Sequence, residues 1–230
     1  MKEKNLITPG EVIVEGMDYL PGEGTYRDGS VIRSSLLGLT QTRDRLVKVI
    51  PLSGRYIPKR DDHVIGVVKE VRYSNWIVDI RAPYDALMMV GEAVDRFIDL
   101  KKDKLSSFFN IGEVMICKIT NVDESMTPMV TARGPGLRKL TDGRIIDVQP
   151  SKIPRLIGKN ASMVKMIKDH TGTKMFVGQN GKVWLQGGNE ALVIKVIRKI
   201  ERDAHKQGLT DEILKILESE GNGNKAEVSD

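Results

Sequence analysis

The stretch RLIGKNASMVK, residues 155–165, decides the fold of the C-terminal part of this chain, because a glycine turn at Gly158 opens there onto a cationic helix. The apolar residues that follow Gly158 share one helical face: Met163, Val164, Met166 and Ile167. The pair Thr171-Gly172 predicts the end of this helix. A glycine turn before a basic helix suits the binding of a phosphate backbone.

Two short strands and a further helix are predicted after this helix. The strands are residues 174–177 and 182–185, joined by Gly178-Gln179-Asn180-Gly181, whose Asn-Gly pair supplies the positive φ angles of a tight hairpin. Asn189 is the expected N-cap of a helix that extends to about residue 200. With a strand at 144–148 in front, the order is strand, short helix, helix, strand, strand, helix.

This order resembles a KH domain, an α+β module that clamps about four nucleotides of single strand with a GXXG loop. The loop here is Gly158-Lys159-Asn160-Ala161, so it lacks the second glycine of the family pattern. The resemblance implies RNA contacts at Lys159, Asn160 and Lys182. It also implies that Gly158 belongs to the KH loop and that Gly178, Asn180 and Gly181 form the KH turn.

Charge is concentrated in this KH-like segment. The 230 residues carry a net charge of +5, and residues 144–206 alone contain 13 basic and 5 acidic residues. Such a concentration is the expected electrostatic footprint of a nucleic-acid partner, although a solvated basic face explains the charge equally well. The length allows two or three small domains.

Residues 1–58 are predicted to form an all-β N-terminal module. Short apolar or alternating runs at residues 11–14, 30–32 and 45–50 are separated by glycine and proline. The module has few bulky apolar residues for a core, so a role in docking to another protein is expected. Packing only against the neighbouring domain is the alternative.

Residues 59–138 contain five predicted strands, at 64–71, 76–80, 86–90, 113–119 and 128–132, which fit a small OB barrel. The run VIGVVKEV followed by WIVDI resembles the first two strands of S1-type RNA-binding domains. Such barrels stack bases on exposed aromatics in a cationic groove. The RNA-binding candidates are Arg72, Tyr73, Trp76, Arg81, Tyr84, Arg96, Lys101, Lys102, Lys104 and Arg133.

Some of these candidates have a structural alternative. Trp76 stands at a strand start, where filling one end of the barrel is favoured over stacking on a base. The loop at 101–104 carries charges of both signs, and the lysines of such loops are most often only solvated. Residues 207–230 are predicted to form a short helix at 211–217, with Thr210 as N-cap, and a disordered acidic tail.

No metal or other cofactor is expected. Cys117 is the single cysteine and lies in an apolar run, so it is expected to be a buried small hydrophobe, and the three histidines are scattered. No window is apolar for long enough to cross a bilayer, and the N-terminus shows no signal-peptide pattern. We therefore expect a soluble, cytoplasmic protein.

The combination of modules resembles the RNA-binding cap subunit of the archaeal exosome. The resemblance covers roughly residues 6–206 and is most specific at GEGTY (22–26), at PLSGRYIP (51–58) running into DHVIG (62–66), and at GQNG (178–181). It implies a non-catalytic protein, three copies of which cap a hexameric ring of RNase PH-like subunits. Some copies can be replaced by a zinc-ribbon cap subunit. The partner that it implies is single-stranded RNA, guided to the pore of the ring.

Two other functions remain open at this point. A hydrolytic nuclease needs clustered carboxylates for metal ions, whereas the acidic residues here are dispersed. A free-standing S1/KH regulator of translation or RNA stability would use the same modules without a ring. The N-terminal module distinguishes the regulator from the cap, because only the cap needs it for docking.

Overall fold

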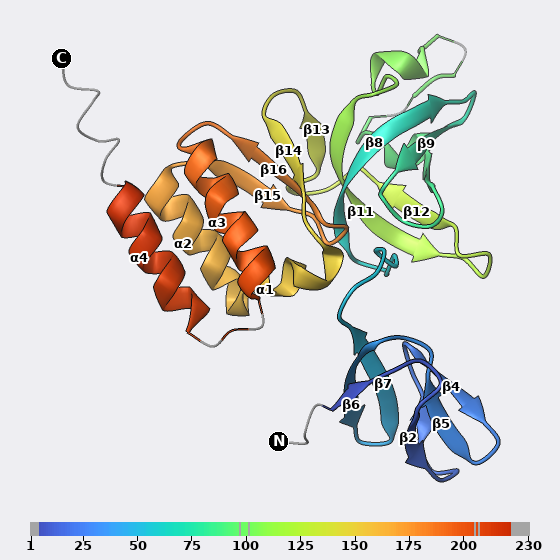
Figure 1. Cartoon of the computed structure of the whole chain (residues 1–230). Helices are drawn as coiled ribbons and strands as arrows, with labels where there is room; N and C mark the ends of the chain where they lie inside the picture. The colour runs from blue at the N-terminus through green and yellow to red at the C-terminus, as the bar shows by residue number, and fades with distance from the viewer. Residues whose placement is uncertain (1–4, 97, 101, 205, 207, 222–230) are drawn as a thin grey trace. The chain divides into compact units, whose positions relative to one another are not determined.

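The computed structural model describes residues 5–96, 98–100, 102–204, 206 and 208–221. Figure 1 shows strands in the first half of the chain and helices grouped near the C-terminus. The chain divides into two compact units at Gly54 and Arg55. The predicted combination of an all-β N-terminal module, an OB-type barrel and an α+β KH domain is confirmed.

The N-terminal unit consists of two small sheets. One has the order β1-β6-β7-β3 and the other β2-β5-β4. The strands are β1 (Leu6–Ile7), β2 (Val12–Glu15), β3 (Leu20–Pro21), β4 (Thr25–Asp28), β5 (Val31–Ser34), β6 (Gly38–Arg43) and β7 (Leu46–Pro51). The three predicted strands correspond to β2, β5 and β7. The others escaped prediction because they are very short or, like TYRD in β4 and GLTQTR in β6, mostly polar.

The barrel is built from five strands: β8 (His63–Val71), β9 (Asn75–Asp79), β10 (Ala86–Met89), β11 (Val114–Val122) and β12 (Pro128–Thr131). Each predicted strand is present within a few residues. The ladder β10-β9-β8-β11 is antiparallel, and β12 closes the barrel by pairing with β11 on one side and, in parallel, with β10 on the other. This closure leaves no free sheet edge among the five strands.

The interior of the barrel is apolar. Trp76, Met88, Met115 and Ile119 are completely buried, and burial raises the pKa of the Cys117 thiol to about 12. Cys117 is therefore the buried hydrophobe that its sequence context predicts. Two short 3-10 helices, η1 (Val90–Glu92) and η2 (Leu105–Ser107), lie between β10 and β11. An additional strand, β13 (Arg138–Leu140), pairs with β11.

The KH domain follows as a three-stranded antiparallel sheet with helices packed on one face (Figure 1). The sheet order is β14-β16-β15. The elements are β14 (Arg144–Asp147), η3 (Pro150–Lys152), α1 (Ile153–Ile157), η4 (Lys159–Ala161), α2 (Ser162–Thr171), β15 (Lys174–Val177), β16 (Lys182–Gln186), α3 (Glu190–Asp203) and α4 (Leu209–Gly221). Asn189 caps α3 by accepting a hydrogen bond from the Leu192 N–H, and Gly172 ends α2 with φ of +63°. Both helix boundaries confirm the sequence prediction.

Helix α4 differs from its prediction. It starts at Leu209, so Thr210 is inside the helix and the expected N-cap is wrong. Leu209, Ile213 and Leu217 are fully buried in the same core as α2 and α3. The helix is thus a structural part of the KH core, although the sequence placed it in a separate C-terminal segment. The predicted disordered tail at 222–230 lies outside the described residues.

Candidate nucleic-acid interface

One cleft on the barrel brings several of the predicted RNA-binding residues together. Its volume is about 370 Å³, and Arg72 and Tyr73, in the turn between β8 and β9, line it together with Lys104. The rest of its wall comes from Val71, Leu100, Asp103, Leu105 and Ser106. The two segments are about 30 positions apart in the sequence and meet only because the barrel closes. We call this the Tyr73 cleft.

The Tyr73 cleft has the chemistry of a single-strand binding site. The Tyr73 side chain is 78% exposed, so a base can stack on its ring. The Arg72 guanidinium lies 2.9 Å from Glu70 Oε2, and this hydrogen-bonded ion pair raises the pKa of Arg72 and lowers that of Glu70. Lys104 forms no ion pair among the residues that the structure describes. Its ammonium group can therefore pair with a phosphate.

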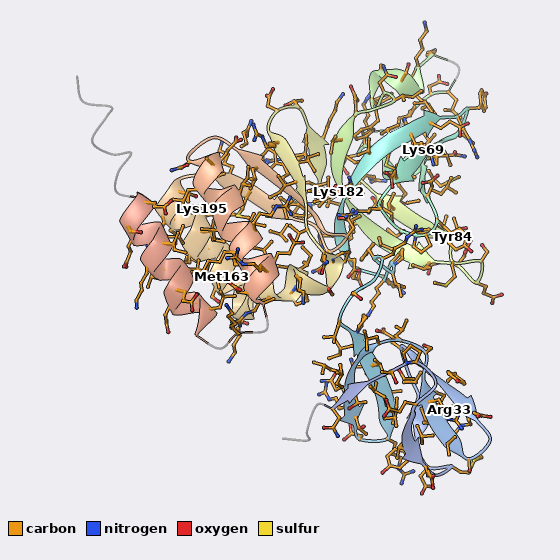
Figure 2. The ribbon with its side chains drawn as sticks, in the orientation of Figure 1. Arg33, Lys69, Tyr84, Met163, Lys182 and Lys195 are labelled. Atoms are coloured by element: carbon orange, nitrogen blue, oxygen red, sulfur yellow. The ribbon has the colours of Figure 1, made fainter. Side chains whose placement is uncertain are left out.

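Other predicted cations lie near this cleft but are partly used within the fold. The Arg96 guanidinium sits 4.7 Å from the centre of the Phe108 ring and 3.7 Å from Asp103. Lys102 is highly exposed and lies 4.0 Å from Asp99. Lys101 lies outside the described residues. Tyr84, in the loop after β9, is also exposed but does not line the cleft. Its neighbour Asp85 forms a 2.7 Å ion pair with Lys69 of β8, and Figure 2 labels both Tyr84 and Lys69.

Trp76 is not available for stacking on a base. Its side chain is fully buried, its ring contacts Phe109 edge-on at 6.0 Å, and its Nε1 donates a 2.9 Å hydrogen bond to the Phe109 carbonyl. The assignment of Trp76 to the RNA-binding set is therefore wrong. The structural alternative, filling the barrel, is correct because an indole in a barrel needs only one internal acceptor.

The KH loop is exposed and has unusual backbone geometry. Gly158 has φ of +75°, and a Cβ added there would lie 2.9 Å from the Met163 Cβ, so this position needs glycine. Asn160 and Ala161 also have positive φ, at 52° and 60°. Lys159 and Asn160 are exposed, as an RNA contact would require. Ala161 carries a side chain where the family pattern has its second glycine.

The turn Gly178–Gly181 joins the KH domain to the barrel. Asn180 is completely buried, and its side-chain amide donates to the carbonyls of Ile65 and Ile80, both at 2.8 Å, and accepts from the Ile65 N–H at 3.3 Å. Of the Asn-Gly pair only Gly181 has positive φ, so the predicted conformation holds for the glycine alone. Gly178 and Gly181 are also buried, with backbone atoms of Ile65 and Val148 close to the space a side chain would need.

Two predicted RNA-binding cations lie at this same joint. The Arg81 guanidinium contacts Asp147 at 3.2 Å and donates to the Val148 carbonyl at 3.3 Å, and Lys182 lies 3.8 Å from Asp147. Figure 2 shows Lys182 between the KH sheet and the barrel. An apolar cluster of Ile65, Ile116, Leu140 and Trp184 completes the contact. Sequence reasoning missed the joint because nothing local to either domain indicates it.

The described residues contain no helix long and apolar enough to cross a membrane. They also contain no cluster of three or more histidine, cysteine or acidic side chains placed to hold a metal ion.

Comparisons with known proteins agree with this architecture. A family profile described as the N-terminal region of exosome complex exonuclease RRP4 matches residues 6–42, and a KH-domain profile matches residues 143–191. The exosome complex component Rrp4 of Thermococcus kodakarensis is 42% identical over 222 residues, which cover 94% of this chain and 86% of the relative. This chain belongs to the Rrp4 family. The Rrp4 protein of Methanosarcina mazei is 41% identical over 220 residues, covering 95% of this chain and 83% of that relative.

A solved structure supports the same relationship. The crystal structure of a protein assigned as an exosome complex RNA-binding protein matches with a TM-score of 0.67 and 33% sequence identity. The match covers 74% of this chain and 99% of that one. Membership of the Rrp4 family therefore rests on both the sequence and the fold.

Proposed function

We propose that this protein is the RNA-binding component of an exosome complex, where it captures single-stranded RNA for degradation from the 3′ end. The proposal rests on its place in the Rrp4 family together with one observation, the convergence of Arg72, Tyr73 and Lys104 on one cleft of a closed barrel. The four segments 1–58, 59–138, 139–206 and 207–230 then serve as docking module, RNA-binding barrel, KH domain and C-terminal extension.

The Tyr73 cleft binds RNA through the backbone and through base faces, without reading the sequence. Tyr73 offers a stacking surface, which every base can use, and Arg72 and Lys104 attract phosphates. Arg96 and Lys102, which lie beside Asp103 and Asp99 near the cleft, add to the positive field around it. Binding by such a site is sensitive to salt and only weakly dependent on base composition.

The KH domain contributes mainly to the architecture. The turn at 178–181 contacts the barrel through the buried amide of Asn180 and through the close backbone approach at its two glycines. At the same joint, Asp147 forms ion pairs with Arg81 and Lys182. Lys159 and Asn160 remain exposed and make a smaller contribution to RNA binding. Ala161 limits how closely a phosphate approaches the loop, because its methyl group occupies a position where the usual loop has only a hydrogen atom.

The N-terminal unit docks onto the nuclease through a sheet face that carries exposed apolar side chains, with the polar pair Gln41 and Lys48 between them. Strand register places Leu6 and Ile50 on either side of Leu39, and places Leu20 beside Leu46. Residues 46 and 50 point to the same side of β7, while the alternate residues Val47 and Val49 are buried. An exposed face of this kind on a small sheet is typical of a protein-protein contact.

The partner that we propose for this face is a hexameric ring of RNase PH-like subunits, capped by three copies of the chain or by a mixture with a zinc-ribbon cap subunit. Catalysis takes place in the ring, so this chain is non-catalytic. We place the assembly in the cytoplasm.

The test is to mix the full chain with RNase PH-like ring subunits from the same source, measure the mass of the complex, and follow decay of a poly(A) substrate. We expect three copies per ring and faster decay. The double variant Arg72→Ala with Lys104→Ala should join the ring normally but lose most of the acceleration. Lys215→Ala, which removes one exposed charge on α4, is the control. A chain that binds RNA but never joins the ring would instead be a free-standing regulator.

A further inference from the structure

A second cationic cleft lies elsewhere on the barrel. Its volume is about 380 Å³, at the lower end of the range for small-ligand sites. Arg60, Lys118 and Arg133 line it, together with Asp61, His63 and the loop that starts at Gly134. Of these residues, only Arg133 was among the RNA-binding candidates. We call this the Arg60 cleft.

Strand pairing assembles one wall of the Arg60 cleft. Lys118 of β11 is the cross-strand partner of His63 at the start of β8, so the two side chains lie next to each other. Lys118 Nζ is 2.8 Å from Asp61 Oδ1. Arg60 is exposed and forms no ion pair within the described part of the chain. Its guanidinium group has the two parallel N–H donors that suit a phosphate.

The opposite wall comes from Arg133 and the loop after it. Arg133 is fixed by a 2.6 Å hydrogen bond from its Nη1 to the Gly91 carbonyl and by Asp95 at 3.2 Å, and its side chain remains 44% exposed. Gly134 and Gly136 have φ of +128° and +80°. Their backbone N–H groups donate to no other described residue, and no atom lies within 4 Å of a Cβ built on Gly136.

These features favour an anion. Three cations and the unpartnered amide of Gly134 line the cleft, whereas Asp61 is the only carboxylate among its lining residues. Lys118 and Arg133 are paired with Asp61 and Asp95, so Arg60 is the cation that an anion meets unpaired. Open glycine amides beside arginine groups are a common way to hold phosphate oxygens. Lys118 lowers the pKa of Asp61, so this carboxylate is charged at neutral pH and competes with an incoming anion for Lys118. Removing that charge should therefore strengthen binding.

We infer that the Arg60 cleft is a second RNA site, which holds a backbone phosphate of the same strand that occupies the Tyr73 cleft. The inference rests on the proposed function. Strand β8 connects the two sites, because His63 at its start lines the Arg60 cleft and Val71 at its end lines the Tyr73 cleft. At about 3.3 Å per residue, the two ends of β8 are about 26 Å apart. Only a strand of several nucleotides reaches both clefts.

Two substitutions test the inference in opposite directions. Arg60→Ala should lower the affinity for a long oligo(A) about threefold to tenfold and reduce the slope of log K against log salt by about 0.7, the value for one single-strand phosphate contact. Asp61→Asn should raise the affinity. Asp61 has φ of +70°, a conformation that asparagine tolerates, and its ion pair with Lys118 is exposed, so the fold should be unaffected.

The measurement is fluorescence anisotropy of labelled oligo(A) of about 16 and about 4 nucleotides, the two ends of the range that one OB fold covers. The full chain is used, Lys215→Ala is the control for loss of one exposed charge, and thermal unfolding verifies folding. We expect the effects of Arg60→Ala and Asp61→Asn with the long oligomer. A short oligomer that occupies only the Tyr73 cleft should bind both variants as it binds the wild type.

The outcomes separate this inference from the proposed function. Wild-type affinity in both Arg60→Ala and Asp61→Asn, with a loss in Arg72→Ala, would overturn the Arg60 cleft as an RNA site and leave the Tyr73 cleft in place. Weaker binding by Asp61→Asn would also overturn it, because the ligand would then need the carboxylate. Unchanged affinity in Arg72→Ala with Lys104→Ala would reject the proposed function itself.

Discussion

Replacing Asn180 with alanine should weaken the joint between the barrel and the KH domain. In the β8–β9 ladder the last pair toward the start of β8 is Val67 with Asp79. Beyond that pair, the side-chain amide of Asn180 takes the place of a strand, because it accepts from the Ile65 N–H and donates to the Ile65 carbonyl. Its Nδ2 also donates to the Ile80 carbonyl oxygen, which lies 2.8 Å from the nitrogen. Alanine supplies none of these contacts.

The cost follows from the groups left without a partner. Asn180 is completely buried, so the substitution leaves one N–H and two carbonyls in an interface that water cannot enter easily. A buried polar group without its partner costs about 1–3 kcal/mol, and water that enters the vacated space recovers some of this. We expect a total loss of about 3 kcal/mol in the free energy of unfolding. For a unit of this size, that lowers the unfolding midpoint by roughly 6–12 °C.

The assay can observe each side of the joint separately, because the two tryptophans are Trp76 in the barrel and Trp184 at the joint. Denaturation should be followed by fluorescence in single-tryptophan variants. In Asn180→Ala the Trp184 transition should move to lower denaturant, ahead of that of Trp76. Gln179→Ala is the matched control, because Gln179 uses only its backbone N–H to contact His63. A Trp184 transition at the same denaturant concentration as that of the control, together with a thermal midpoint within about 1 °C of it, would refute the reasoning.

Three further predictions concern other parts of the chain. Ala161→Gly should raise the free energy of unfolding by about 0.5–1 kcal/mol in denaturant titrations. The φ angle of 60° at this position costs conformational energy for alanine, whereas glycine adopts it without a steric penalty. Asp203 is stabilised as a carboxylate chiefly by Lys206, which lowers its pKa from 3.8 to about 2, so its contribution to stability is present above pH 4 and is lost as the pH falls to about 2. The difference in unfolding temperature between wild type and Asp203→Asn should therefore shrink over that range, and a constant difference would contradict the linkage. Leu46→Asp, on the proposed docking face, should reduce co-purification with the ring at least tenfold while leaving RNA affinity unchanged, and normal assembly would remove this face from the contact.

Features that depend on neighbouring residues were predictable from the sequence. The hydrophobic period gave the strands of the barrel and the order of elements in the KH domain. The N-cap at Asn189 and the stop at Gly172 were correct because capping depends on a side chain and a backbone angle within one turn. The sequence also placed Arg72, Tyr73 and Lys104 among the RNA-binding candidates. Their meeting in one cleft is seen only in the structure, and their contact with RNA stays a prediction.

Features that depend on contacts between distant segments were not predictable in the same way. In the sequence, Asn180 has the pattern of a turn residue, yet its partners Ile65 and Ile80 are at least 100 positions away. Trp76 stood among the RNA-binding candidates, but its position at a strand start already favoured filling the barrel, and the structure buries it completely. The packing of helix α4 in the KH core was not predicted, because its burial depends on α2 and α3, which its own sequence does not specify.

Net charge alone does not identify which cations are free to bind an anionic strand. Residues 144–206 carry the largest excess of basic residues, yet many of these cations pair within the fold. Lys199, Arg202 and Lys206 all lie within 3.6 Å of the Asp203 carboxylate. A paired cation has already lost much of its attraction for a phosphate, since the neighbouring carboxylate cancels its field at short range. The Tyr73 cleft contains fewer charges, but Lys104 there has no internal partner and stands beside an exposed ring. Affinity for RNA should therefore follow the convergence of unpaired cations and aromatic surface instead of the charge of a domain.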